Sequence, residues 1–142
     1  MEPIMAAKDL FHNSVKQALL KEDWVITADP LKLKIEGVKL EVDLAAEKII
    51  AAQKAECKIA VEIKSFLNTS VITDFHAALG QFLNYRLALQ MTESERILYL
   101  AVPIDTFGTF FQETFIEEAV KLYQVKLIIY DPVEEVISEW KN

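Results

Sequence analysis

Hydrophobic side chains that recur every three to four positions predict the helices of this chain. Residues 8–21 and 71–91 each place such a stripe on one face, and Ser70 offers a side-chain cap for the second helix. Residues 104–124 follow the same period and predict a largely helical segment that breaks near Gly108. Each of these helices is expected to bury its apolar face against another layer of structure.

Alternating or continuous apolar runs predict the strands. They cover residues 24–27, 31–35, 38–44, 59–64, 96–102, 125–130 and 133–140. Glu36-Gly37 predicts a hairpin turn between two of these strands, because glycine adopts the positive φ that a tight hairpin needs. Residues 96–102 and 125–130 are typical of central strands covered on both faces, and 133–140 predicts a final edge strand. Residues 45–56 show no clear period, and no element is assigned to them.

The order of elements predicts an α/β fold. One helix comes first, several strands follow, and helices then alternate with strands to the end of the chain. This order fits a mixed central β-sheet flanked by helices on both faces. The 142 residues show neither an internal repeat nor a linker, so one domain is expected over residues 1–142, with residues 1–6 as a flexible N-terminus.

Composition and charge narrow the chemistry. The chain holds 22 acidic and 15 basic residues, a net charge of −7, which disfavours DNA binding driven by charge alone. Its single cysteine excludes an intramolecular disulfide and a cysteine-based zinc site, and its two histidines exclude a histidine-rich metal site. No apolar run approaches the length of a membrane span, so no membrane partner is expected. We expect a reduced, cytoplasmic location.

The segment Glu62-Ile63-Lys64 carries the most informative charges. Residues two apart in a strand share one face, so a carboxylate and an ammonium lie together in an otherwise apolar strand, where unpaired charge is costly. Asp43 closes the preceding alternating strand and comes near Glu62 if the two strands pair antiparallel. Adjacent carboxylates repel, and a divalent cation such as Mg²⁺ or Mn²⁺ on Asp43 and Glu62 would relieve the repulsion. With Lys64 to stabilise charge on a phosphate, these residues form a site for phosphodiester hydrolysis.

The second helix adds a polar strip beside its apolar one. Gln81 and Tyr85 lie four residues apart on one face, and Asp74 lies on about the same stripe. Facing a metal site, such a strip could orient a nucleic-acid backbone or one of the carboxylates. Both features also have a plain structural interpretation, since a strand glutamate beside its own lysine and a polar helix strip are often simply solvent-exposed. His12 is interpreted as a partly buried helix residue, with a role in the site as the alternative.

Two levels of resemblance follow from these residues. The order Asp43, then Glu62-Ile63-Lys64, then Gln81-x-x-x-Tyr85 resembles the PD-(D/E)xK nuclease superfamily and its glutamine–tyrosine helix motif. Nearly all of residues 5–140 resembles the XisH family of excision controlling factors from cyanobacteria. The residues that carry this likeness are Ala6-Ala7-Lys8-Asp9 with Phe11-His12, Asp43-Leu44-Ala45-Ala46-Glu47, Ile59-Ala60-Val61-Glu62-Ile63-Lys64-Ser65-Phe66, and Ala78-Leu79-Gly80-Gln81.

The resemblance implies a restriction-endonuclease-like fold and a role in the excision of the fdxN DNA element. It implies that the chain acts alongside a site-specific recombinase and a small partner protein of the XisI type. By position, the resemblance makes Asp43 and Glu62 metal ligands and Lys64 the catalytic lysine.

Three accessory residues come from the same resemblance. Gln81 and Tyr85 would be the accessory pair of the helix motif. Many nucleases of the superfamily carry a glutamate on the first helix, and His12 occupies the comparable place here.

Two other functions compete with metal-dependent DNA cleavage. The chain could be a non-catalytic regulatory subunit that binds the small partner and steers the recombinase, which the net charge of −7 favours. An unrelated enzymatic function on an α/β fold is the third hypothesis and has no motif in its support. The phenylalanines at 107, 110, 111 and 115 are interpreted as core, with a homodimer face as the alternative.

Overall fold

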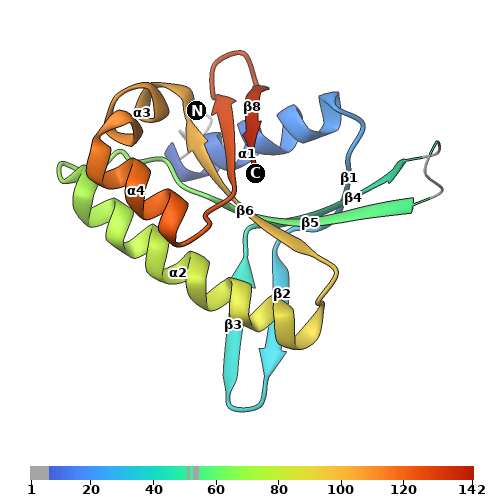
Figure 1. The fold of residues 1–142 in the computed structure, drawn as a ribbon. Coiled ribbons are helices and arrows are strands. Elements are labelled where there is room, and N and C mark those ends of the chain that lie inside the picture. Colours follow the sequence, from blue (N-terminus) through green and yellow to red (C-terminus); the bar gives the residue numbers. More distant parts are fainter. Residues whose placement is uncertain (1–6, 51, 53–54) are drawn as a thin grey trace, which may run out of the picture.

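A mixed six-stranded sheet forms the centre of the fold (Figure 1). The computed structural model describes residues 7–50, 52 and 55–142. The strands of this sheet are β1 (Val25–Ala28), β4 (Leu44–Ile50), β5 (Ala55–Ile63), β6 (Ile97–Pro103), β7 (Leu127–Asp131) and β8 (Val136–Lys141). Their order in space is β1-β4-β5-β6-β7-β8. β5, β6 and β7 run parallel, whereas the pairs β1–β4, β4–β5 and β7–β8 are antiparallel, so the expected mixed sheet is confirmed.

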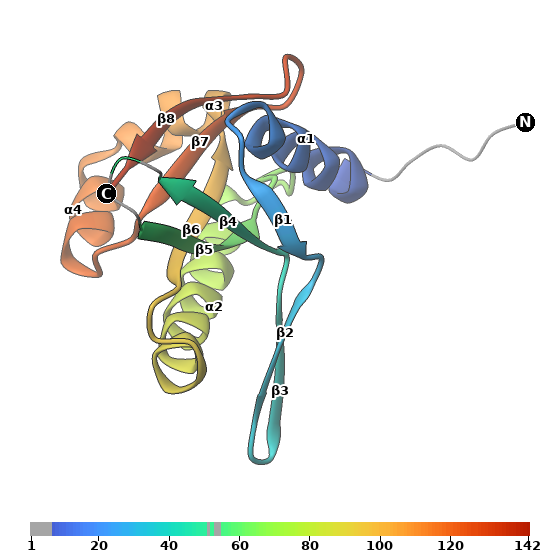
Figure 2. The same cartoon turned by 90° about the vertical axis from the view of Figure 1, so that its right-hand side faces the viewer.

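Helices cover both faces of this sheet, as the order of elements predicts (Figure 2). They are α1 (Ala7–Lys21), α2 (Val71–Thr92), α3 (Ile104–Gly108), the 3-10 helix η2 (Phe110–Gln112) and α4 (Thr114–Leu122). Successive residues of a strand point to opposite faces, so β6 contributes side chains to the hydrophobic core on each face of the sheet. Leu98 and Leu100 pack with the side chains of α2 and α4, while Tyr99 and Ala101 pack with those of α1.

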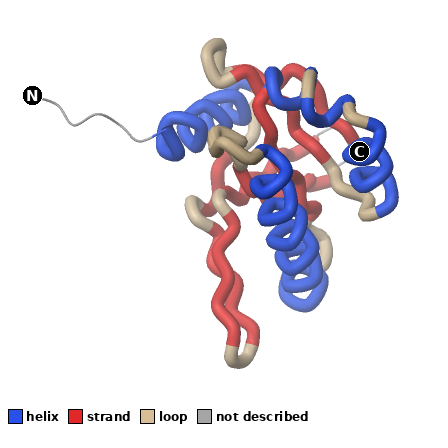
Figure 3. The backbone as a smooth tube through the Cα atoms, turned by 90° about the vertical axis from the view of Figure 1, so that its left-hand side faces the viewer, coloured by secondary structure: helices blue, strands red, loops and turns tan. Residues whose placement is uncertain are grey.

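The second sheet is a hairpin that extends away from the body of the protein (Figure 3). It consists of β2 (Leu31–Ile35) and β3 (Val38–Val42). Gly37 has a φ of +80° in the turn, which confirms the predicted hairpin and the reason for its glycine. Leu33 and Leu40 attach the hairpin to the core on the α2 side of the main sheet.

One strand prediction is wrong at its C-terminal end. Residues 38–44 do not form one strand, because the chain bends at Asp43 and leaves the hairpin for the main sheet. The continuation, β4, pairs antiparallel with β5 and includes residues for which the sequence assigned no element. The antiparallel pairing on which the proximity of Asp43 and Glu62 depends is therefore made by β4 rather than by β3.

The helix boundaries follow the sequence signals closely. Ser70 caps α2 by accepting a hydrogen bond from the Thr73 backbone N–H at 3.3 Å. The segment after β6 breaks after Gly108 into α3, η2 and α4, as predicted. Phe107, Phe110 and Phe111 join the core, whereas Phe115 is 72% exposed. The final strand, β8, lies at the edge of the sheet as expected.

The predicted flexible terminus, residues 1–6, lies outside the described residues. Among the residues that the structure describes, no helix combines the length and the hydrophobicity needed to cross a membrane.

Candidate active site

Two backbone–carboxylate hydrogen bonds hold Asp43 and Glu62 together. The strand register pairs Leu44 with Val61, which places the next residues, Asp43 and Glu62, side by side at the end of the β4–β5 ladder. The Asp43 backbone N–H donates to Glu62 Oε1 at 3.3 Å. In return, the Ile63 backbone N–H donates to Asp43 Oδ2 at 2.7 Å. The bend at Asp43 is thus fixed by the same contacts that bring the two carboxylates together.

Glu62 is a buried acid beside a second acid. Its side chain is 7% exposed, and its Oε2 lies 3.4 Å from Lys64 Nζ. Burial and the neighbouring Asp43 charge raise the pKa of Glu62 from 4.5 to about 7, although the Lys64 charge lowers it. The lysine therefore compensates only part of the cost of placing a charge here.

The backbone of Lys64 is held from two sides. Its N–H donates to the Ala101 carbonyl at 3.0 Å and extends the pairing of β5 with β6. Its own carbonyl accepts a hydrogen bond from the Tyr130 hydroxyl at 3.0 Å. Burial raises the pKa of Tyr130, so this phenol remains a neutral donor. Only the side chain of Lys64, 26% exposed, is left to move.

The predicted accessory pair on α2 lies on the site's face of the sheet. Burial, followed by the charges of Glu62 and Asp43, raises the pKa of Tyr85, so its phenol lies within the field of both carboxylates. Gln81 is one turn away on the same helix, and its Oε1 is buried without a hydrogen-bond partner. Asp74 is not part of this group, because its carboxylate accepts hydrogen bonds from the backbone and side chain of Asn68.

His12 approaches the site from the opposite face. Together with Asp43 and Lys8 it lines a small cavity of about 30 Å³, enough for about one water molecule. Its ring, however, is engaged elsewhere, since Nε2 lies 2.7 Å from Asp29 Oδ1. Burial alone would raise the pKa of Asp29, but hydrogen bonds with Lys16 and His12 hold that pKa below its ordinary value.

The carboxylates at the site suit a metal ion that takes few ligands from the protein. Within the described part of the chain, no three histidine, cysteine, aspartate or glutamate side chains gather as a metal-binding cluster. Asp43 and Glu62 supply two carboxylates, which matches Mg²⁺, because this ion commonly takes one or two carboxylates and completes its shell with water and phosphate oxygens.

These features define an α/β protein with two carboxylates and a lysine gathered at the end of a mixed sheet. The chain belongs to the XisH family, whose profile, described as XisH protein, matches residues 5–138. This finding confirms the family that the sequence resembles.

Two solved structures share this fold. One is the crystal structure of an XisH family protein from Nostoc punctiforme PCC 73102, which is 51% identical, with a TM-score of 0.87 over 94% of this chain and 100% of that one. The other is an fdxN element excision controlling factor protein from Anabaena variabilis, also 51% identical, with a TM-score of 0.86 over 94% of this chain and 99% of that one. No curated protein matches the chain.

Two residues that shape the site carry no recognisable signal in the sequence. Tyr130 holds the Lys64 carbonyl from β7, and Asp29 binds His12 from the loop after β1. Each contact joins residues far apart in the chain, and neither residue belongs to a motif, so no signal in the sequence identified them.

Proposed function

We propose that this protein is a metal-dependent, restriction-endonuclease-like DNA hydrolase that takes part in the excision of a DNA element. The observation that carries the proposal is the grouping of Asp43, Glu62 and Lys64. They are joined by the Asp43 N–H to Glu62 Oε1 bond of 3.3 Å and by the 3.4 Å contact between Glu62 Oε2 and Lys64 Nζ. Two acids and a lysine in this order, on adjacent strand ends, match the PD-(D/E)xK pattern that the sequence resembles.

Asp43 and Glu62 would hold a Mg²⁺ or Mn²⁺ ion. The raised pKa of Glu62, about 7, reflects burial and repulsion from Asp43, both of which a divalent cation offsets. When bound, such an ion supplies Lewis-acid polarisation of a phosphoryl oxygen.

The chain's own groups then act on the phosphodiester. The Lys64 ammonium is kept at the site by a backbone fixed on both sides, and it stabilises the negative charge that grows on the phosphate during hydrolysis. Tyr85 through its hydroxyl and Gln81 through its amide N–H donate hydrogen bonds that position the carboxylates or the DNA strand from α2. His12 contributes as an accessory group through its cavity with Asp43.

The biological setting of the proposal comes from the family. The Anabaena variabilis relative is described as an fdxN element excision controlling factor. We propose the same role here, with a site-specific recombinase and a small XisI-type partner as the proteins that act beside it.

A regulatory subunit without catalysis is the second candidate. The net charge of −7 favours it, because a chain of this charge holds DNA weakly on its own. This candidate predicts a stable complex with the small partner and no cleavage with any metal. In this candidate the protein acts by binding the small partner and steering the recombinase, and Lys64 has no catalytic role.

Cleavage assays on two variants test the proposal. Asp43→Asn and Glu62→Gln each remove one carboxylate charge and are expected to abolish Mg²⁺- or Mn²⁺-dependent cleavage of supercoiled or branched DNA. Glu47→Gln is the matched control, since Glu47 is a partly buried acid on β4 that pairs with Lys58 rather than with the site. If both site variants cleave as well as the wild type, the proposal is wrong.

A further inference from the structure

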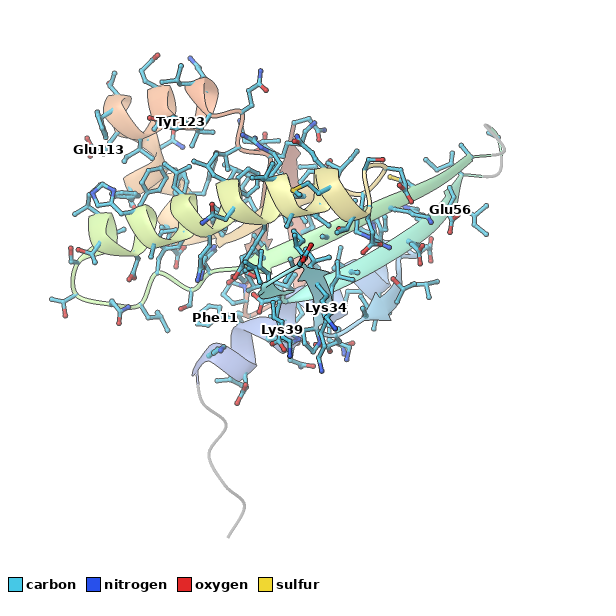
Figure 4. All side chains as sticks on the ribbon, turned by 90° about the horizontal axis from the view of Figure 1, so that it is seen from below. Phe11, Lys34, Lys39, Glu56, Glu113 and Tyr123 are labelled. Carbon is cyan, nitrogen blue, oxygen red and sulfur yellow. The ribbon has the colours of Figure 1, made fainter. Side chains whose placement is uncertain are left out.

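The β2–β3 hairpin has two chemically different faces. Its register pairs Leu33 with Leu40, and these residues pack against the core on the α2 side. The alternate positions carry the charged side chains, with Lys34 opposite Lys39 and Lys32 opposite Glu41. These side chains are exposed, and Figure 4 shows Lys34 and Lys39 on the side of the hairpin turned away from α2.

The pairing of Lys34 with Lys39 contributes nothing to the fold. Like charges directly opposite each other in an antiparallel pair are destabilising. Among the ion pairs of the described residues, none involves Lys32, Lys34 or Lys39. Glu41 lies opposite Lys32 and two residues from Lys39 on the same face, so it offsets part of the positive charge there. With three lysines against one glutamate among its paired residues, the outer face of the hairpin is a local excess of positive charge in a chain of net charge −7.

The hairpin leads directly into the candidate active site. β3 ends at Val42, and the next residue is Asp43. At about 3.3 Å per strand residue, Lys39 lies roughly 13 Å from Asp43, which equals the rise of about four base pairs along the axis of a DNA duplex. Lys34 extends this contact from the neighbouring strand. An anion held by Lys39 therefore lies about 13 Å along the strand from Asp43, close enough for one duplex to reach both.

We infer that the outer face of the β2–β3 hairpin, through Lys34 and Lys39 with Lys32 beside them, binds the phosphate backbone of duplex DNA next to the cleavage site. This inference rests on the proposed function, and it explains how an acidic chain can hold DNA in the right place. The hairpin extends from the body (Figures 1 and 3), so it can follow the backbone of a duplex whose scissile phosphate lies at Asp43. Phosphate contacts of this kind set position rather than sequence specificity.

A salt titration of DNA binding tests the inference without cleavage. The fluorescence anisotropy of a labelled duplex is measured against protein in EDTA over a series of salt concentrations. The test variant is Lys34→Gln with Lys39→Gln. The control is Lys121→Gln with Lys141→Gln, which removes the same charge from two exposed lysines on α4 and β8.

Each lost phosphate contact lowers the slope of log affinity against log salt by about 0.9. The hairpin variant is therefore expected to lose about 1.8 of the wild-type slope. Between ~50 and ~200 mM salt, the fold-decrease in duplex affinity is therefore about ten times smaller for the hairpin variant than for the wild type. The control is expected to retain the wild-type slope.

Two results would overturn the inference: equal slopes for hairpin variant and control, or no binding by the wild type at low salt. Equal slopes would mean that the hairpin lysines serve only to protect the open strand edges from aggregation. The proposed hydrolysis is tested separately. If the protein binds DNA through the hairpin but never cleaves it, the inference about the hairpin stands and only the catalytic proposal is wrong.

Discussion

Replacing Glu62 with glutamine should stabilise the metal-free protein at neutral and alkaline pH. In the fold the pKa of Glu62 is raised from 4.5 to about 7, because the carboxyl is buried beside Asp43. Between these two values the folded state binds a proton at Glu62 that the unfolded state has released. Protonated Glu62 therefore contributes its full share to the free energy of unfolding below about pH 4.5. This contribution is lost as the pH rises through about 7.

The size of the effect follows from the shift. At about 1.4 kcal/mol for each tenfold change in proton affinity, the change from 4.5 to about 7 corresponds to about 3 kcal/mol. Glu62→Gln is neutral at every pH and escapes this loss. The difference in stability between variant and wild type should therefore grow by about 3 kcal/mol, in favour of the variant, from acid pH to about pH 8.

Urea denaturation in EDTA at several pH values measures this difference. Because the wild type and Glu62→Gln share every other titrating group, those groups cancel when the two unfolding free energies are subtracted at each pH. Glu118→Gln, on the exposed surface of α4, is the control for the loss of one carboxylate. If variant and wild type differ by the same amount at acid and alkaline pH, Glu62 is not held in its neutral form. In that case Asp43 and Glu62 would not need a cation to lie side by side.

Three further substitutions test individual contacts. Gln81→Leu removes a buried oxygen that has no partner, so urea denaturation should show a gain of about 1 kcal/mol in the free energy of unfolding. DNA cleavage should fall in the same variant, and unchanged cleavage would contradict the accessory role of Gln81. Tyr130→Phe should cost about 1–3 kcal/mol in the same assay, because the Lys64 carbonyl loses its donor, and an unchanged stability would show that the bond does not hold the site. His12→Ala should raise the pKa of Asp29 toward its ordinary value in an NMR titration, and an unmoved pKa would exclude the 2.7 Å contact in solution.

Much of the fold could be predicted because local signals and burial agree. Gly37 supplied the turn of the hairpin and Ser70 the cap of α2. The apolar runs at 96–102 and 125–130 match two central parallel strands. The three site residues could be grouped from the sequence because strand periodicity puts Glu62 and Lys64 on one face and antiparallel pairing brings Asp43 beside them.

β4 was not predicted because its local preference and its environment conflict. Its sequence, Leu44–Ile50, contains Ala-Ala-Glu-Lys, which favours a helix. Ala45 and Ala46 are nevertheless fully buried in the sheet, where small side chains allow close packing. The bend at Asp43 depends on hydrogen bonds with Glu62 and Ile63, which lie some twenty residues further along the chain, and a local pattern carries no trace of them.

The most direct test of the catalytic site is the nicking of supercoiled DNA by Lys64→Ala, with Mg²⁺ or Mn²⁺ and with and without the small partner. Lys58→Ala is the matched control, because both lysines lie on or just beyond β5, pair with a glutamate and are similarly exposed, at 26% for Lys64 and 28% for Lys58. We predict that the wild type and Lys58→Ala nick the DNA and that Lys64→Ala does not. Equal nicking by all three proteins, or none by the wild type under any of these conditions, would contradict the assignment of Asp43, Glu62 and Lys64 as a hydrolytic site.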